Sequence, residues 1–222
     1  MDILGFLQNN ADQALYLTWE HAWIVGLSVG IATLIGVPIG VVITKYETLA
    51  RRVMNTANIF MTIPSIALFG LMLPLLSVFG HGLGKVPAVI ALVLYSQLPI
   101  IRNTYVAIKN VPPAVVNAGR GMGMSNWQLL KEVELPLAIP VILAGLRTAA
   151  VMNIGIAAIA TFVGAGGLGV YIQKGIDMVY DDMIVTGAIL VSLFAIVVDG
   201  SMAGIERALT PKGIKIQRKQ NK

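Results

Sequence analysis

The chain has 222 residues, of which 56% are hydrophobic and only 12% are charged. Soluble domains carry roughly 25% charged residues, so this composition excludes an ordinary soluble domain and indicates an integral membrane protein. The absence of cysteine from the sequence excludes disulfides and thiolate metal sites. The formal net charge of +5 is high enough to suggest nucleic-acid binding, so the distribution of the charges must be considered.

The first 21 residues precede the apolar part of the chain and contain neither lysine nor arginine. They lack the basic start and the small-residue cleavage end of a removable signal peptide, so we expect residues 1–21 to remain as an extracytoplasmic segment. Tyr16, Trp19 and Trp23 are aromatic residues of the kind that gather at membrane–water interfaces.

Five apolar segments follow, of about the length needed for a membrane-spanning helix, which takes ~20 residues. Each contains glycine or proline, which such helices tolerate because neighbouring helices satisfy the freed backbone groups. In the first segment, Gly26/Gly30 and Gly36/Gly40 have the spacing that lets helices approach closely, and we interpret them as packing positions. The segments are approximately 22–43, 59–79, 86–101, 137–163 and 183–205.

The basic residues predict how these segments are oriented. With five crossings the termini lie on opposite sides, and an outside N-terminus places fourteen of the sixteen lysines and arginines in the cytoplasm. Only Lys85 and Lys174 then face outward, which is a strong positive-inside bias. The net charge is thus explained without nucleic acid, and residues 208–222 are predicted to form a basic cytoplasmic tail beside anionic headgroups.

The sequence therefore predicts an all-α polytopic membrane protein with about five transmembrane helices in a single domain over residues 22–207. It contains no evident internal repeat. An odd number of crossings also argues against the inverted halves that are common in secondary carriers. We therefore expect a transport pathway to require a dimer.

A polar insert at residues 110–136 interrupts the apolar pattern and is expected to lie in the cytoplasm. Pro112 and Pro113 suit the first turn of a helix, where a missing N–H is harmless. Gly121 and Gly123 are expected to end this helix, which would be only ~15 Å long at 1.5 Å per residue. One side of it carries small or apolar residues at helical spacing, namely Ala114, Val115, Ala118 and Met122.

A second short helix is predicted after this one. Ser125 and Gln128 have the spacing of a capping box at the start of residues 126–134. Pro136 is expected to mark the start of a separate helix. Helix patterns alone leave two interpretations of the insert: a docking element for another protein, or an ordinary structured loop.

The stretch GAGGLG places Gly164, Gly166 and Gly169 in the pattern G-x-G-x-x-G. A dinucleotide site would need a preceding strand and an acidic residue about 20 positions later. Here the pattern follows an apolar segment and is expected to face outward. We therefore interpret these glycines as a sharp turn, since glycine adopts positive φ angles readily.

Two charges, Arg147 and Asp199, fall within apolar segments, where each costs ~2.5–3.5 kcal/mol at the bilayer centre. They are hypothesised to pair with each other or to make paired contacts at a dimer interface; the alternative is that they snorkel to the membrane surface. His21 and His81 are far apart in the sequence, so no metal site is expected. The sequence also has no recognisable catalytic triad and no Walker lysine motif.

Residues 117–136 resemble the EAA loop of ABC-importer permeases, written E-A-A-x-x-x-G, nine residues, then I-x-L-P. Asn117, Ala118 and Gly119 stand for E-A-A, and the spacing from Gly123 to Pro136 is maintained. Asn117 replaces the acid and Gly119 the second alanine, so a salt bridge at the first position is not expected here. The resemblance implies that contacts to an ATPase are made by Asn117, Ala118, Gly119, Arg120, Met122, Gly123, Val133, Leu135 and Pro136.

Longer stretches, including LPLAIPVILAGLRTAAV and FVGAGGLGVYI, closely resemble the osmoprotectant permeases, and this likeness covers about residues 20–212. It implies a membrane subunit that imports glycine betaine, choline or carnitine, with no catalytic residue and no cofactor of its own. Two partner ATPase subunits would bind ATP and Mg²⁺. A second copy or a related permease would complete the pathway, and an extracytoplasmic solute-binding protein would deliver the substrate.

The resemblance also implies that Asp177, Asp181 and Asp182 lie near the docked binding protein; the alternative is a solvated outer loop. Three other functions remain open. The chain could be a methionine-type or other small-solute ABC permease, an ion-coupled carrier or channel, or a membrane scaffold that transports nothing. In each case the sequence places it in the cell membrane, with the N-terminus outside and the C-terminus in the cytoplasm.

Overall fold

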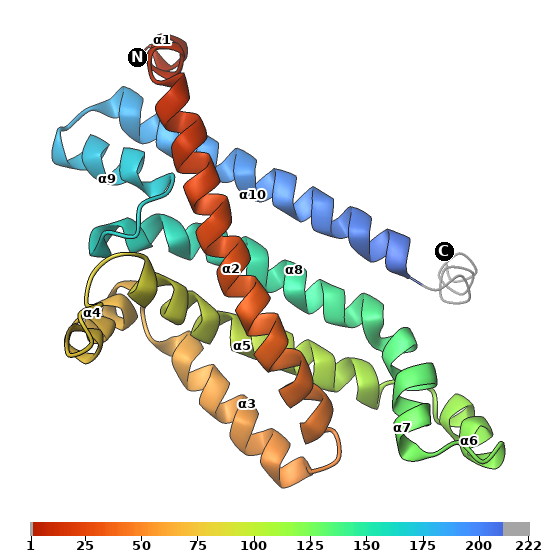
Figure 1. Cartoon of the computed structure of the whole chain (residues 1–222). Helices are drawn as coiled ribbons and strands as arrows, with labels where there is room; N and C mark the ends of the chain where they lie inside the picture. Colours follow the sequence, from red (N-terminus) through yellow and green to blue (C-terminus); the bar gives the residue numbers. More distant parts are fainter. Residues whose placement is uncertain (1, 211–222) are drawn as a thin grey trace.

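The computed structural model describes residues 2–210, and all regular secondary structure in this range is helical, as predicted (Figure 1). The first half of the chain contains α1 (Ile3–Asn9), α2 (Ala11–Ile43), α3 (Glu47–Thr62), α4 (Ser65–Ser77) and α5 (Lys85–Lys109). The second half contains α6 (Pro113–Gly121), α7 (Asn126–Gln128), η1 (Leu129–Glu134), α8 (Leu135–Ile159), η2 (Ala160–Val163), α9 (Gly169–Asp177) and α10 (Asp181–Leu209). Most of the predicted tail, 208–222, lies outside the described residues.

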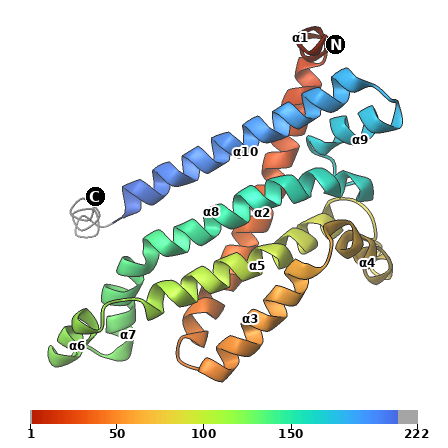
Figure 2. The ribbon, with the colours of Figure 1, turned by 180° about the vertical axis from the view of Figure 1, so that it is seen from behind.

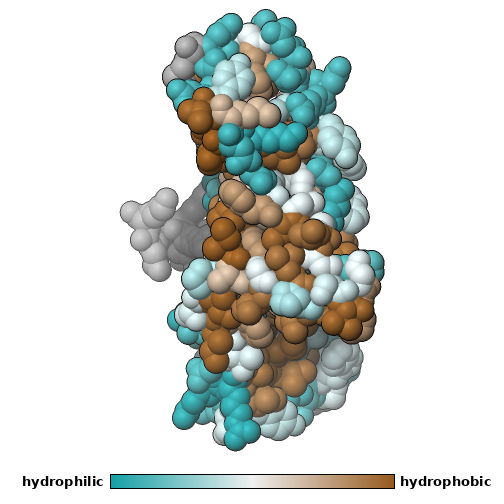
Figure 3. All heavy atoms as spheres, turned by 90° about the vertical axis from the view of Figure 1, so that its left-hand side faces the viewer, coloured by the Kyte–Doolittle hydropathy of each residue, from teal (hydrophilic) through white to brown (hydrophobic). Residues whose placement is uncertain are grey.

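Four stretches of helix are long and apolar enough to cross a membrane: α2, α5, Asn126–Val163 and α10. A fifth crossing is formed if α3 and α4 are counted together. The predicted all-α membrane fold with about five spans is therefore confirmed. Large hydrophobic side chains remain exposed over this surface, and they dominate the middle of the face in Figure 3, with hydrophilic residues gathered above and below.

The predicted segment 59–79 is not one straight helix. α3 and α4 meet at an angle of 99°, and Ile63 and Pro64 between them have extended backbone angles. Pro64 disfavours a helical conformation at Ile63, so α3 has to end there. The Tyr95 hydroxyl of α5 donates a hydrogen bond to the Ile63 carbonyl at 2.5 Å, which satisfies one backbone group at the break.

α2 begins at Ala11 and so extends beyond the first predicted apolar segment, and its polar residues Glu20 and His21 have partners inside the fold. One further predicted boundary is wrong. Pro136 does not start a separate helix: α7, η1 and α8 are continuous. It follows the π-helical segment η1, and the wider turns of such a segment allow a helix to continue past a local irregularity.

α5 is the central helix and packs against α2, α3 and α8 (Figures 1 and 2). A Cβ added at Gly36 of α2 would lie 2.9 Å from Ile100 Cγ2, and one at Gly40 would lie 2.6 Å from Thr104 Cβ. This pair of glycines therefore allows α2 and α5 to approach closely, as predicted. The other pair, at positions 26 and 30, faces open space within the described chain.

The bundle has two ends with different contents. α6 and α7 lie at one end, which we call the α6 end (Figure 1). α1, α9 and the glycine-rich turn that precedes α9 lie at the other, which we call the α9 end (Figure 2). The predicted functional residues therefore fall at opposite ends of the molecule, with the charged pair of α8 and α10 between them.

Candidate functional site

α6 is defined by proline at its start and glycine at its end. Pro113 occupies the first turn, and the helix finishes at Gly121. Gly123 then has a φ of +81°, a left-handed conformation that glycine adopts without strain. The N–H of Met124 donates to the Gly119 carbonyl at 3.1 Å, which closes the turn. The predicted boundaries of this helix are confirmed.

The start of α7 is fixed by the predicted capping box. The Gln128 N–H donates to the Ser125 hydroxyl at 3.3 Å, and the Ser125 N–H donates to the Gln128 side-chain oxygen at 2.9 Å. These bonds satisfy backbone donors that the helix itself leaves free. The turn between α6 and α7 is therefore held by hydrogen bonds of Met124, Ser125 and Gln128.

Gly119 is the point where α6 packs on the following helix. A Cβ at this position would lie 2.7 Å from Leu129 Cδ1 and 3.2 Å from Met124 Sδ, and Val133 lies just beyond. Leu129 is buried beneath α6. The replacement of the second alanine of the motif by glycine thus permits a close approach of two helices within this chain.

A neighbouring face of α6 carries exposed apolar side chains. Met122 is 72% exposed and Val115 is 41% exposed, and Trp127 of α7, close by in the chain, is 67% exposed. Ala114 and Ala118 are also exposed. α6 therefore presents apolar side chains outward while it packs on Leu129 of η1 through Gly119.

The residues predicted to contact an ATPase divide into two groups. Those open to a partner are Asn117, Ala118, Arg120, Met122 and Gly123. Gly119 is buried, and Val133, Leu135 and Pro136 are partly buried. Sequence reasoning missed Leu129 and Trp127, because their roles depend on how the two helices cross.

A cleft of about 590 Å³ lies on the side of α6 that faces the bundle, between α6, η1 and the ends of α2 and α5. Its charged lining residues are Lys45, Lys109, Arg120 and Glu134, and Asn117 also lines it. The cleft thus contains three cations and one carboxylate. The cleft therefore has an excess of positive charge, and asparagine at position 117, where the motif has an acid, does not reduce it.

At the α9 end, the glycine-rich stretch forms the predicted sharp turn. Gly164, Gly166 and Gly167 have φ angles of +80°, +84° and +80°. The Gly167 N–H donates to the Glu20 carboxylate at 2.7 Å, and Lys85 forms an ion pair with the same carboxylate at 2.7 Å. A Cβ at Gly166 would overlap this carboxylate, so the close approach requires glycine.

His21 binds the same turn from the interior of the fold. It is fully buried, and its Nδ1 accepts a hydrogen bond from the Leu168 N–H at 3.2 Å. Nε2 must then carry the ring proton, and it donates to the Ile154 carbonyl at 3.1 Å. His21 therefore connects α2, the turn and α8. In the described part of the chain, no group of three His, Asp or Glu residues could hold a metal ion.

The three aspartates predicted to lie near a binding protein follow this turn. Asp177 ends α9, and Asp181 and Asp182 occupy the first turn of α10, where carboxylates favour the helix dipole. Asp177 and Asp181 are exposed, whereas Asp182 is partly buried. Two of the three carboxylates are therefore free to meet a partner.

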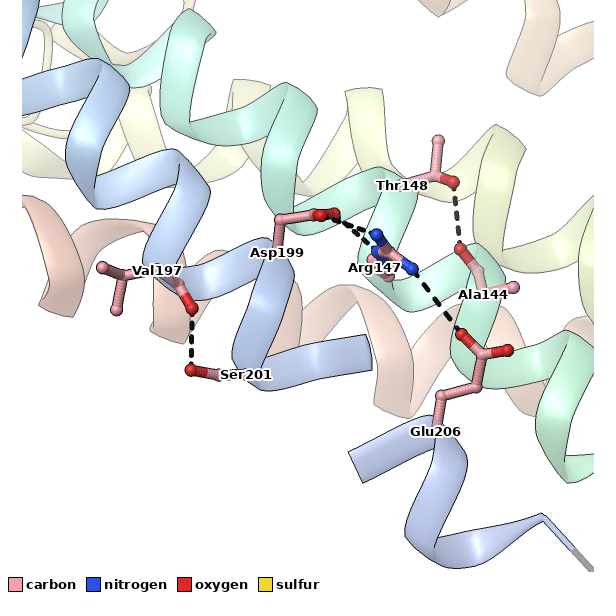
Figure 4. Close-up of polar contacts among 7 residues, drawn as sticks. All are labelled: Ala144, Arg147, Thr148, Val197, Asp199, Ser201 and Glu206. Atoms are coloured by element: carbon pink, nitrogen blue, oxygen red, sulfur yellow. Dashed lines mark hydrogen bonds and ion pairs between the residues drawn. The ribbon is translucent and has the colours of Figure 1, made fainter. Parts of the chain in front are cut away.

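Arg147 of α8 and Asp199 of α10 form an ion pair (Figure 4). Arg147 Nε and Nη2 donate to the two carboxylate oxygens at 2.5 and 2.6 Å, and Glu206 lies 3.9 Å from Nη1. The pair therefore satisfies both charges within this chain. Arg147 and Asp199 remain 35% and 40% exposed and line a groove of about 490 Å³ beside the two helices.

Comparison with known proteins places this geometry in context. Residues 33–211 match the profile of the family described as "Binding-protein-dependent transport system inner membrane component". The osmoprotectant import permease protein OsmW of Salmonella typhimurium is 50% identical over 97% of this chain and 100% of its own length. In Bacillus subtilis, the glycine betaine/carnitine/choline permease protein OpuCB is 43% identical and the choline permease protein OpuBB is 44% identical, each over 96% of both chains.

Solved structures show the same fold. A chain of the MetNI methionine ABC transporter, captured in inward-facing conformations, matches with a TM-score of 0.79 and 27% identity, over 89% of this chain and 96% of that one. A chain of an amino acid ABC transporter matches with a TM-score of 0.77 over 94% and 99%, at 19% identity.

Proposed function

The chain belongs to the family of binding-protein-dependent transport system inner membrane components, and we propose that it is the permease subunit of an ATP-driven importer for quaternary-ammonium osmoprotectants. Glycine betaine, choline and carnitine are the proposed substrates. The proposal of this substrate class is supported by three relatives of 43–50% identity whose names state it. A methionine-type permease is the second candidate, favoured by the match in fold to the MetNI chain at 27% identity.

The apolar outer face of α6 is the observation that carries the proposed mechanism. An exposed apolar surface on a polar segment is expected to be covered by another protein. We propose that each of two ATPase subunits receives an α6 in a surface cleft, with Ala118 and Met122 in the contact. Gly119 and Leu129 would then transmit force to the membrane helices, because they fix α6 on η1.

The proposed orientation follows from the charges at the two ends. The α6 end carries the basic cleft and would lie in the cytoplasm, with the C-terminus. The α9 end would lie outside, where Asp177 and Asp181 would meet the solute-binding protein. Two permease chains, identical or related, would enclose the pathway between these ends.

ATP binding would draw the two α6 helices together and open the pathway outward, and release would return it inward. A shift from 1:99 to 99:1 between two such states requires about 5.5 kcal/mol of differential bias. All of that bias would reach the membrane helices through α6 and its support. The close packing at Gly119 suits this task, since a loose contact would absorb the movement.

The test uses the transporter reconstituted in proteoliposomes with its ATPase, second permease and binding protein. The double variant Val115→Asp/Met122→Asp places two charges on the outer face of α6. It is expected to lower ATP-driven glycine betaine uptake at least about tenfold, because each charge must be desolvated at the contact. ATPase subunits should also co-purify poorly with it.

Leu4→Asp is the matched control, since Leu4 is 74% exposed at the α9 end and receives the same change. It should leave uptake intact. Normal ATP-driven uptake by the α6 double variant would contradict the coupling role. Uptake by the wild-type chain that runs on an ion gradient without ATP would contradict the importer class.

A further inference from the structure

A groove of about 630 Å³ opens between α3 and α5 in the half of the span nearer the α6 end. α5 is otherwise the most buried of the membrane-spanning helices. α3 contributes Asn58 and Met61 to the groove, and α5 contributes Leu98, Arg102, Asn103 and Val106. The lining thus combines one cation, two side-chain amides and apolar groups.

Arg102 is exposed in this groove and takes part in none of the ion pairs among residues 2–210. It lies about 10 Å along the helix from Lys109, the last residue of α5, at 1.5 Å per residue. An arginine within a span is costly unless it is paired or faces water. Arg147 meets that condition through Asp199, so Arg102 requires water, at the membrane surface or in a cavity, or an anionic partner.

The neighbouring side of α3 is polar as well. Asn55, Asn58 and Thr62 recur at spacings of three and four residues, and all three are exposed. Residues with this spacing share one side of a helix. A polar side within a membrane faces a water-filled cavity or protein rather than lipid. The groove is therefore placed where a polar solute could pass.

We propose that this groove is a subsite of the translocation pathway that binds the carboxylate of a zwitterionic substrate, with Arg102 as its principal contact. This inference rests on the proposed function and adds a residue that selects within the substrate class. A guanidinium binds a carboxylate through two parallel hydrogen bonds. The Asn58 amide offers further donors, as does the second N–H of the Asn103 amide, whose first donates to the Pro99 carbonyl at 2.8 Å. Met61, Leu98 and Val106 provide apolar surface for the methyl groups of the substrate.

Arg102 also distinguishes between substrates by charge. Glycine betaine and carnitine carry a carboxylate, which gains an ion pair with Arg102. Choline is a cation without a carboxylate, so it meets only repulsion from the same guanidinium. The binding protein selects the class of substrate, and the groove favours the zwitterions within it.

The test again uses the complete reconstituted transporter, with loaded binding protein at saturation and uptake and ATP hydrolysis measured together. Arg102→Gln is expected to lower the glycine betaine and carnitine moved per ATP by about tenfold, the scale of a hydrogen bond to a charged group. Choline uptake should be unchanged or higher. For glycine betaine and carnitine, the uptake per ATP of Arg102→Lys should lie between that of the wild type and that of Arg102→Gln. Lysine retains the positive charge but lacks the planar guanidinium that forms two parallel hydrogen bonds.

Arg207→Gln is the control, since it makes the same change at an exposed arginine of α10. It should leave the uptake per ATP unchanged for the zwitterions and for choline. A parallel loss of uptake and ATP hydrolysis for every substrate would overturn the inference, since Arg102 would then hold the fold or pair with a second permease chain. Unchanged uptake per ATP in Arg102→Gln would overturn it as well. Failure of the wild-type transporter to import any of the three compounds would instead count against the proposed function.

Discussion

The α9 end and the α6 end share local features of backbone and helix packing, but they differ in how far their side chains are satisfied within the chain. Both contain glycines with positive φ and helices that cross at a glycine. At the α9 end, the polar groups of Glu20, His21 and Lys85 bind one another or the backbone of the turn. At the α6 end, the capping box secures α7, but the apolar face of α6 stays uncovered. The polar groups around the turn at the α9 end are therefore satisfied within a single chain, whereas the apolar face of α6 is left uncovered by it.

This difference predicts that substitutions within the glycine-rich turn at the α9 end change the stability of the chain more than substitutions on the outward face of α6 do. The outward face of α6 should tolerate change in the isolated chain and fail only in the assembled transporter. Three variants that alter packing or pairing within the chain test the contrast, in order of decreasing effect.

The largest effect is expected from Gly167→Val at the α9 end. Position 167 has a φ of +80°, and a Cβ there would lie 2.9 Å from His21 Nδ1. Backbone strain and overpacking together should cost about 2–5 kcal/mol of unfolding free energy. Denaturant titration of the purified chain in detergent measures it. Gly155→Val is the control, since a Cβ at Gly155 meets nothing within 4 Å; equal stability of the two variants would refute a tight turn.

An intermediate effect is expected from Gly119→Leu at the α6 end. The added side chain would collide with Leu129 and lift α6 from its support, at a cost of about 1–3 kcal/mol. Because α6 lies at the edge of the bundle, the membrane helices should stay folded while ATP-driven uptake falls. Limited proteolysis of the insert and uptake assays together measure this. Gly121→Ala, which meets open space, should behave like the wild type; cleavage of the insert at wild-type rates in Gly119→Leu would show that the contact is dispensable.

The smallest effect is expected from Lys85→Met at the α9 end. The Lys85 side chain is 47% exposed, so solvent screens its ion pair with Glu20, and the loss should stay below about 1 kcal/mol. The bond from the Gly167 N–H to Glu20 remains in this variant. The same denaturant titration measures the change, and a loss as large as that of Gly167→Val would mean that the ion pair, and not the turn, holds this end together.

Local signals made the α6 end predictable from the sequence. Pro113, Gly123 and the Ser125–Gln128 box each act within a few residues, so their effect could be inferred without the fold. The break at Pro64 could not be inferred in this way. Pro38, Pro74, Pro99 and Pro140 all lie inside helices, so proline alone does not identify the place where a helix ends in this protein.

Other features depend on contacts between distant parts of the chain. Glu20 and His21 bind a turn about 147 positions later, which no local pattern reveals. The motif predicts that Gly119 contacts another protein, yet its side of α6 faces Leu129 of the same chain. Position in a motif does not specify which face of a helix a residue occupies. Only the crossing of the two helices decides that.

The continuous helix from Asn126 to Val163 has a mechanical consequence. It is roughly 55 Å long at 1.5 Å per residue, and it touches α6 through Leu129 and His21 through Ile154. One run of helix thus connects the α6 end to the turn at the α9 end. A movement of α6 would therefore be passed along this helix, and we expect labels placed near its two tips to change position in the same step.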